Sequence, residues 1–142
     1  SGPNLVKILT EKGFDVTYTA IVPDEAEMIQ SELLKCADEK KIALVLTTGG
    51  TGFSPRDITP EATLAVADRN APGIAEAMRY HSLSITPRGM LSRAASVLRG
   101  KTLIVNLPGS PKAVQENLEY ILPSLEHGLR IAAGLDGECA RK

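Results

Sequence analysis

The pattern of hydrophobic and polar positions along the chain predicts helices that alternate with short strands. Apolar residues at helical spacing predict helices over 3–12, 23–39, 59–69, 72–83, 86–91, 112–121 and 123–132. Runs rich in β-branched and other apolar residues predict strands over 14–22, 42–46, 95–98 and 102–107. The last two strands flank Arg99, Gly100 and Lys101, and this arrangement predicts a hairpin.

This order of elements predicts a three-layer α/β sandwich. Strands that alternate with helices form right-handed crossovers, which build a mostly parallel sheet with helices on both faces. The run over 42–46 is apolar without alternation, as expected for a strand covered on both faces. The hairpin would add one antiparallel strand at the edge. Residues 1–142 contain no internal repeat or linker and are predicted to form a single domain.

The charge composition of the chain limits the kinds of partner that it can bind. The 142 residues include 16 Lys and Arg and 17 Asp and Glu, which gives a net charge of −1. This balance argues against a general binder of nucleic acid or membrane surfaces, which needs a surplus of cations. No run reaches the ~18 apolar residues of a membrane span. Any anionic ligand must therefore be held by a local site.

The two cysteines have no metal-ligand spacing. Cys36 falls within an apolar helical pattern and is expected to be a small buried residue, whereas Cys139 lies in a polar tail. A disulfide between them is one alternative, but this cysteine usage favours a reduced protein in the cytoplasm.

Three common motifs are absent. Pro55 stands where a dinucleotide-binding fingerprint needs its third glycine. Ala95 stands where a P-loop ending at 100–102 needs its first glycine. The chain has no G-x-S-x-G elbow, so we exclude an α/β-hydrolase.

A glycine-rich loop is the first candidate binding site. It follows the predicted strand over 42–46 and contains Gly49, Gly50, Thr51 and Gly52. Glycines let the backbone turn sharply and point its N–H groups toward an anion. Ligands of parallel sheets lie at the carboxyl ends of the strands, where this loop must be. On spacing alone, a tight turn without a ligand explains the loop equally well.

Two aspartates follow predicted strands. Asp24 comes after the strand over 14–22, and Asp57 closes the glycine loop. If those strands are neighbours, both carboxylates face one crevice. Carboxylates beside a phosphate site repel the ligand unless a cation intervenes, which suggests Mg²⁺. Each aspartate also has a structural alternative that spacing alone favours: a charge at a helix start for Asp24, and a partner for Arg56 or a turn cap for Asp57.

A second strand end runs into a helix start after residue 105. It could offer another anion site through helix N–H groups and a hydroxyl, or it could simply be a capped turn. The residues concerned are Asn106, Pro108, Gly109 and Ser110. Ser92, beside Arg93, adds a hydroxyl at a predicted helix end.

The 17-residue segment 47–63, TTGGTGFSPRDITPEAT, carries a specific resemblance together with several shorter segments. These are 22–25 (VPDE), 71–73 (APG), 85–87 (ITP), 90–93 (MLSR), 99–104 (RGKTLI) and 106–111 (NLPGSP). The combination resembles the molybdopterin adenylyltransferases, the Mog/MoaB-like domain family to which the N-terminal domain of gephyrin belongs. The resemblance covers nearly the whole chain.

The resemblance implies a homotrimer that transfers AMP from ATP to molybdopterin in a Mg²⁺-dependent reaction. The products would be pyrophosphate and adenylylated molybdopterin, which a molybdate-insertion enzyme would then use. The resemblance places the catalytic acids and metal ligands at Asp24 and Asp57. It places contacts to the pterin phosphate and the nucleotide on the 49–52 loop, on Ser92 and on the 106–110 turn.

One departure from the family lies at the start of the chain. Family members carry a strand and a Ser-rich, acidic loop ahead of the segment that begins here at Ser1. The resemblance therefore predicts a sheet without its first strand. Two alternatives to the enzyme remain at this point: a non-catalytic scaffold or trimerisation module, and a MoaB-type member that binds pterin or nucleotide without this step. A nucleotide-recycling relative would show Gly-Gly-Leu-Gly in place of 49–52.

Overall fold

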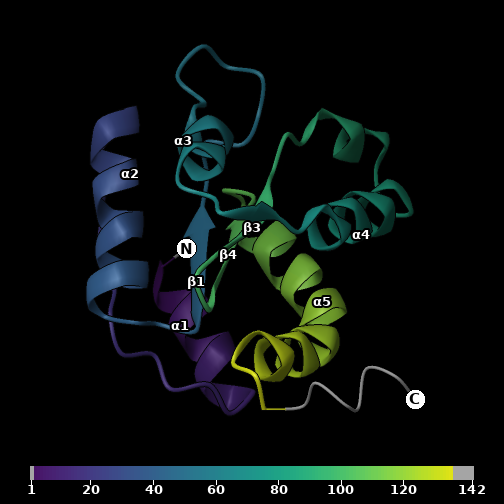
Figure 1. Cartoon of the computed structure of the whole chain (residues 1–142). Coiled ribbons are helices and arrows are strands. Elements are labelled where there is room, and N and C mark those ends of the chain that lie inside the picture. The colour runs from purple at the N-terminus through teal and green to yellow at the C-terminus, as the bar shows by residue number, and fades with distance from the viewer. Residues whose placement is uncertain (1, 136–142) are drawn as a thin grey trace.

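Helices cover both faces of one sheet in the computed structural model, which describes residues 2–135 (Figure 1). Within these residues the strands are β1 (Leu44–Thr48), β2 (Arg69–Asn70), β3 (Ser96–Arg99) and β4 (Thr102–Leu107). The α-helices are α1 (Gly2–Glu11), α2 (Ala26–Leu34), α3 (Thr59–Ala65), α4 (Pro72–Leu83) and α5 (Pro111–Ala132). A π-helical turn, η1 (Lys35–Glu39), extends α2, and a 3₁₀ helix, η2 (Pro87–Leu91), follows α4. The predicted α/β sandwich is confirmed.

The sheet has the strand order β1-β4-β3-β2 over the described residues. β1 pairs with β4 in parallel, whereas β3 is antiparallel to both β4 and β2. Three strands therefore point one way and β3 alone points the other, and the predicted hairpin is β3–β4. The antiparallel strand was expected at the edge of the sheet, but β2 (Arg69–Asn70) pairs on its outer side. No strand was predicted there, and Arg69 was expected to end the helix over 59–69.

The central strand β4 divides the core between the two helical layers. Its side chains point alternately to opposite faces, as the two-residue period of a strand requires. Leu103, Val105 and Leu107 pack in one cluster with residues of α1, α4 and α5. Ile104 packs on the other face with residues of α2 and α3. This burial sets the orientation of β4, and therefore of the site at its carboxyl end.

Residues 14–22 belong to no helix or strand, so the predicted strand there was wrong. The segment does have the side-chain pattern of a strand, because Phe14, Val16 and Tyr18 are half-buried and the residues between them are exposed. Tyr18 Oη donates a 2.8 Å hydrogen bond to Glu32, which ties the segment to α2. No described strand pairs with it. Alternating burial shows only that one side of the segment is covered. It does not show that a neighbouring strand forms hydrogen bonds with its backbone.

The two helices predicted over 112–121 and 123–132 form one continuous helix, α5. Pro123 lies inside it, although an internal proline removes a hydrogen bond and costs about 3 kcal/mol. Continuing the helix keeps one buried apolar face, and each fully buried side chain of this size contributes roughly 1.5–3 kcal/mol. That face includes Leu118, Ile121, Leu122 and Leu125. Neither α5 nor any other described helix is long and apolar enough to cross a membrane.

Cys36 is buried in η1, as expected from its apolar pattern. Burial raises the pKa of its thiol, which keeps it protonated and unreactive near neutral pH. Cys139 and any pairing with it lie outside the described residues.

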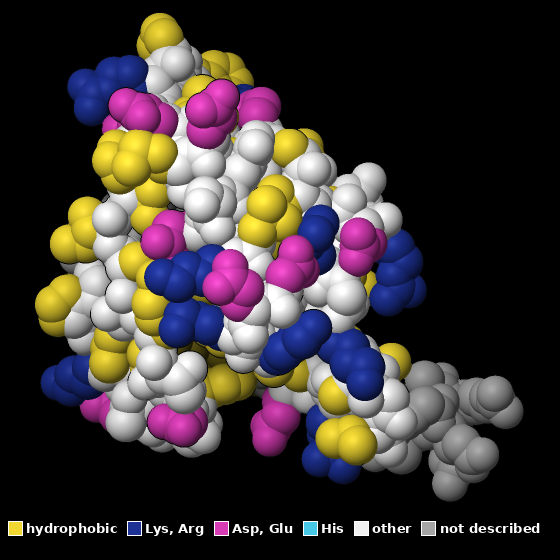
Figure 2. Space-filling view, turned by 60° about the vertical axis from the view of Figure 1, so that its left-hand side comes forward, with side chains coloured by type: hydrophobic (Ala, Val, Ile, Leu, Met, Phe, Trp, Pro, Cys, Tyr) yellow, Lys and Arg dark blue, Asp and Glu magenta, His cyan; other side chains and the backbone are white. Residues whose placement is uncertain are grey.

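Charged side chains of both signs are interspersed over the face shown in Figure 2. This local mixing agrees with the net charge of −1 for the whole chain. Many of the basic side chains on this face lie near acidic ones, so much of it has no broad area of positive charge of the kind that attracts polyanions.

Candidate active site

Two loops meet at the carboxyl ends of the parallel strands β1 and β4. Thr48 lies opposite Leu107, and the next residue, Gly49, donates its N–H to the Leu107 carbonyl at 3.0 Å. A Cβ atom on Gly109 would lie 3.4 Å from the Cα of Gly49, so the 49–52 loop touches the 108–110 turn. The structure thus brings together the two segments that the sequence predicted at this edge.

The backbone of the glycine loop passes close to the start of α3 at Gly50. Gly50 has a φ of +70°, and a Cβ atom there would overlap the hydroxyl oxygen of Thr59. The Gly50 carbonyl accepts a 3.2 Å hydrogen bond from the Thr59 N–H. Thr59 is the first residue of α3, and Ile58 before it supplies no side-chain cap.

We expect Gly50→Ala to lower the free energy of unfolding by about 3 kcal/mol, because it adds a steric clash to a left-handed backbone. Gly13→Ala is the matched control, since Gly13 has a φ of +91° but nothing lies within 4 Å of the point that its Cβ atom would occupy. The control should lose only about 1–2 kcal/mol, the cost of the left-handed backbone alone. Urea unfolding measures both values. Equal losses would contradict a close approach at Gly50.

Asp57 closes the loop through a local turn. Its Oδ2 accepts a 2.9 Å hydrogen bond from the Ser54 N–H, and its own N–H donates to the Ser54 carbonyl at 2.9 Å. A Cβ atom on Gly52 would lie 2.9 Å from the same Oδ2, so the glycine leaves room for the carboxylate. The turn therefore holds the Asp57 carboxylate against the glycine loop.

Asp24 lies just before α2 and reaches the same loop through Arg56. Its carboxylate forms a 3.4 Å ion pair with the Arg56 guanidinium, and both side chains are largely exposed. The sequence suggested Arg56 as a partner of Asp57, but in the structure its ion pair is with Asp24. An exposed pair of this kind contributes at most about 1 kcal/mol. A phosphate-bearing ligand could therefore replace Asp24 as the partner of the Arg56 guanidinium at little cost.

Asn106 is fully buried at the end of β4, and both polar atoms of its side chain are used inside the protein. Its Oδ1 accepts from the Ala95 N–H at 3.0 Å. Its Nδ2 donates to the hydroxyls of Thr47 at 2.9 Å and Thr63 at 3.0 Å. The side chain therefore links β4 to β1 and α3 beneath the site. A direct contact between Asn106 and a ligand stays a prediction.

Arg93 is the site residue that sequence reasoning missed. Its guanidinium donates to the carbonyls of Gly52 at 2.8 Å and Asp57 at 2.6 Å, and to the carboxylate of Glu61 at 2.5 Å. The hydrogen bond between Arg93 and Glu61 lowers the pKa of Glu61 and raises the pKa of Arg93, so both groups stay charged. The sequence did contain one signal for Arg93, its position next to the candidate Ser92. An arginine there can hold several acceptors at once, because its guanidinium carries five donors in a fixed fork.

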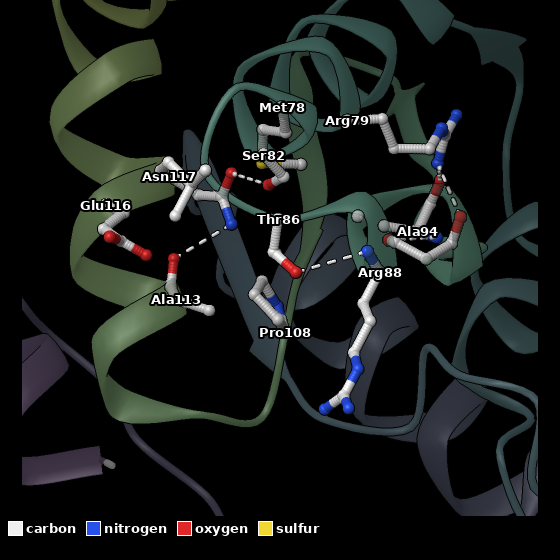
Figure 3. Close-up of a pocket in the computed structure, with 13 residues that line it drawn as sticks. Met78, Arg79, Ser82, Thr86, Arg88, Ala94, Pro108, Ala113, Glu116 and Asn117 are labelled. Carbon is white, nitrogen blue, oxygen red and sulfur yellow. Dashed lines mark hydrogen bonds between the residues drawn. The ribbon is translucent and has the colours of Figure 1, made fainter.

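Ser92 and Pro108 line a cavity of about 190 Å³ between α4, η2 and α5 (Figure 3). Its lining mixes apolar groups such as Met78 with polar side chains. Ser82 and Asn117 point toward each other in Figure 3 and share a 3.2 Å hydrogen bond. A hollow of this size, lined by both apolar and polar groups, can hold part of a small molecule. Since Pro108 belongs to the 108–110 turn, the cavity adjoins that turn, which itself touches the 49–52 loop.

Ser110 begins α5 as its N-cap. Its hydroxyl accepts a 3.4 Å hydrogen bond from the Ala113 N–H, and its carbonyl accepts from the Val114 N–H. The positive end of a 22-residue helix thus points toward the loop region, which favours a bound anion.

The donor set of Asp24 and Asp57 fits Mg²⁺. This ion prefers oxygen ligands and is usually held by one or two carboxylates together with substrate phosphates. Among residues 2–135 no group of three or more His, Cys, Asp or Glu side chains could hold a metal ion by itself. The protein would therefore supply part of the coordination sphere and the substrate the rest.

Comparison with known proteins matches residues 1–127 to a family described as "Probable molybdopterin binding domain". The chain is 54% identical over 103 residues to the molybdopterin adenylyltransferase of Haemophilus influenzae, which covers 72% of this chain and 52% of that protein. It is 48% identical over 114 residues to the gephyrin of Dictyostelium discoideum, covering 80% of this chain and 16% of that one. The solved structure of the molybdopterin biosynthesis enzyme MoaB from Thermus thermophilus is 47% identical, with a TM-score of 0.88 over 94% of this chain and 84% of that one.

The chain spans about half the length of the curated adenylyltransferase of Haemophilus influenzae. The family match nevertheless covers most of the chain, including both loops, the cavity and the two aspartates. By sequence and by structure, the chain belongs to the molybdopterin-binding domain family that the 47–63 segment predicted.

Proposed function

We propose that this domain transfers AMP from ATP to molybdopterin during molybdenum cofactor synthesis and releases pyrophosphate. The observation that carries the proposal is the meeting of the 49–52 loop and the 108–110 turn, with Asp57 beside the same loop and Asp24 paired to it through Arg56. The curated relatives named molybdopterin adenylyltransferase support the same reaction.

The reaction requires two anionic groups to be held in line. The terminal phosphate of molybdopterin attacks the α-phosphorus of ATP, and pyrophosphate leaves. This nucleophile is already an anion, so no strong base is needed, and catalysis consists of positioning and charge stabilisation. The N–H groups of the glycine loop and the N-terminus of α5 are the groups that would hold the phosphates.

The cavity beside Pro108 is where we place the pterin end of the substrate. Polar side chains of its lining, among them Ser82, Ser92 and Asn117, would orient a flat ring system against the apolar groups. The turn from Pro108 to Ser110 would then meet the pterin phosphate, and the glycine loop would meet the nucleotide.

Asp24 and Asp57 would hold Mg²⁺, which shields the repulsion between reacting phosphates when it is bound. The two aspartates would place their carboxylates at the edge of the 49–52 loop, where the metal ion would bind. Since the attacking group needs no deprotonation, we assign them to metal binding and orientation rather than to proton transfer.

The resemblance also supports a homotrimer in the cytoplasm that passes its product to a molybdate-insertion enzyme. Light scattering after size-exclusion chromatography tests the trimer directly, and a single-chain mass would contradict it.

A direct assay tests the proposed reaction. The purified chain is incubated with molybdopterin, ATP and Mg²⁺, and both pyrophosphate and adenylylated molybdopterin are measured. Equal amounts of the two products would support the proposal. Binding of molybdopterin without either product would favour a non-catalytic binding module, the alternative suggested by the likeness to gephyrin.

A further inference from the structure

We propose that Arg93 is a positioning residue that holds the loop of residues 51–57 and, with it, the carboxylate of Asp57. The guanidinium joins both ends of the 52–57 segment, because it donates to the carbonyls of Gly52 and Asp57. The Arg93 N–H adds a 2.8 Å hydrogen bond to the Thr51 carbonyl. This inference rests on the proposed function, since it assigns Arg93 a part in preparing the same site.

Arg93 supplies most of what anchors this loop. Apart from the exposed Arg56–Asp24 pair, every hydrogen bond that joins residues 51–57 to the rest of the described chain involves Arg93. The Asp57 carboxylate accepts its hydrogen bond from the Ser54 N–H, which belongs to the same loop. The position of that carboxylate relative to the rest of the protein therefore depends on Arg93.

The chemistry of the contact requires arginine. Nε, Nη1 and Nη2 each bind a different acceptor, on Gly52, Glu61 and Asp57 respectively. A planar guanidinium offers five donors in a fixed fork, whereas a lysine ammonium is a point charge on a flexible stem. Glu61, on α3, fixes the plane of the fork. Arg93→Lys therefore keeps the charge but loses the simultaneous grip on both ends of the loop.

Arg99 provides a matched control at the other end of the strands. Its guanidinium likewise combines a backbone carbonyl, that of Val66 at 2.9 Å, with a close carboxylate, that of Asp38 at 2.8–2.9 Å, and the Asp68 carboxylate lies 3.9 Å away. The two arginine side chains are similarly exposed, at 33% for Arg93 and 28% for Arg99. Arg99 lies at the β3–β4 hairpin, opposite Thr102 and away from the carboxyl end of β4.

The expected result is a separation of activity from stability. Arg93→Lys should lower kcat for adenylyl transfer by about 10- to 100-fold, since small errors in position at a reacting centre have effects of this order. Its KM for molybdopterin should change by less than about threefold, because the cavity is untouched. Arg99→Lys should shift the urea midpoint by a similar amount and keep kcat. Equal kcat in the two variants would overturn the proposal.

Amide hydrogen exchange tests the same inference without substrate. The N–H groups of Asp57 and Thr59 bond to Ser54 and Gly50, so their protection reports the loop. They should exchange at least about tenfold faster in Arg93→Lys and at the wild-type rate in Arg99→Lys. Unchanged exchange in Arg93→Lys overturns the positioning role. If the wild-type chain makes no product but this difference is present, the proposed reaction fails and the hold of Arg93 on the loop stands.

Discussion

Asp57→Asn should lower adenylyl transfer by at least about 100-fold while leaving the fold intact. The asparagine oxygen can still accept the hydrogen bond from the Ser54 N–H, so the local turn is kept. What is lost is the negative charge that would help hold Mg²⁺ beside the phosphates, and metal-assisted charge stabilisation is worth several kcal/mol. Turnover is measured over a series of Mg²⁺ concentrations, because a lost ligand weakens metal binding as well as the rate.

Asp68→Asn is the control for this substitution. Asp68 also accepts a backbone N–H, from Gly100 at 2.7 Å, and lies 3.9 Å from the Arg99 guanidinium, but it stands just before β2, beside the β3–β4 hairpin and away from the site. We expect this variant to keep wild-type turnover and to lose a similar, small amount of stability. Near-normal turnover of Asp57→Asn at saturating Mg²⁺ would show that the charge of Asp57 is not needed, and the assignment would be wrong.

The position of the site could be predicted from the sequence because it follows from local patterns. The apolar residues 102–107 predict a buried strand, and the glycines after β1 predict a sharp turn. The sequence placed both the 49–52 loop and the 108–110 turn at strand ends, and they meet because β1 and β4 pair in parallel, which the structure shows. The hydrogen bond between Asp57 and Ser54 joins residues three apart and is equally local.

The features that could not be predicted depend on partners far away in the chain. Residues 14–22 have the alternating burial of a strand. Whether another strand forms hydrogen bonds with them depends on residues distant in the sequence. β2 has only two residues, which is too short to leave a pattern. Pro123 predicts the end of a helix, but α5 continues through it because its apolar face is buried against the rest of the protein.

The same distinction applies to individual side chains of the site. Arg93 and Gly52 are separated by 41 residues, and Asn106 and Thr63 by 43. Neither spacing can be recognised from composition or periodicity. Sequence reasoning could therefore name Asn106 as a candidate ligand contact, yet only the structure shows its side chain bonded inside the protein.

Asn106→Ala should lower the free energy of unfolding by about 3 kcal/mol or more. The substitution removes three hydrogen bonds and leaves the Ala95 N–H and the hydroxyls of Thr47 and Thr63 without this partner. Each buried polar group left unsatisfied costs roughly 1–3 kcal/mol. Because Asn106 is fully buried, water cannot easily replace the amide. This loss is a large share of the roughly 5–15 kcal/mol that is typical of a domain.

Urea unfolding measures this loss, and Asn117→Ala is its matched control. Asn117 is also buried, but it makes two side-chain hydrogen bonds, one of them to Ala113 in its own helix and one to the half-buried Ser82. The control should therefore lose only about 1–2 kcal/mol. The urea midpoint should fall much further for Asn106→Ala, with the slope of the transition unchanged, since the substitution alters stability and not the surface exposed on unfolding. Equal losses of unfolding free energy in the two variants would contradict the prediction. They would mean that the hydrogen bonds from Asn106 to Thr47 and Thr63 stabilise the fold no more than those of Asn117 do.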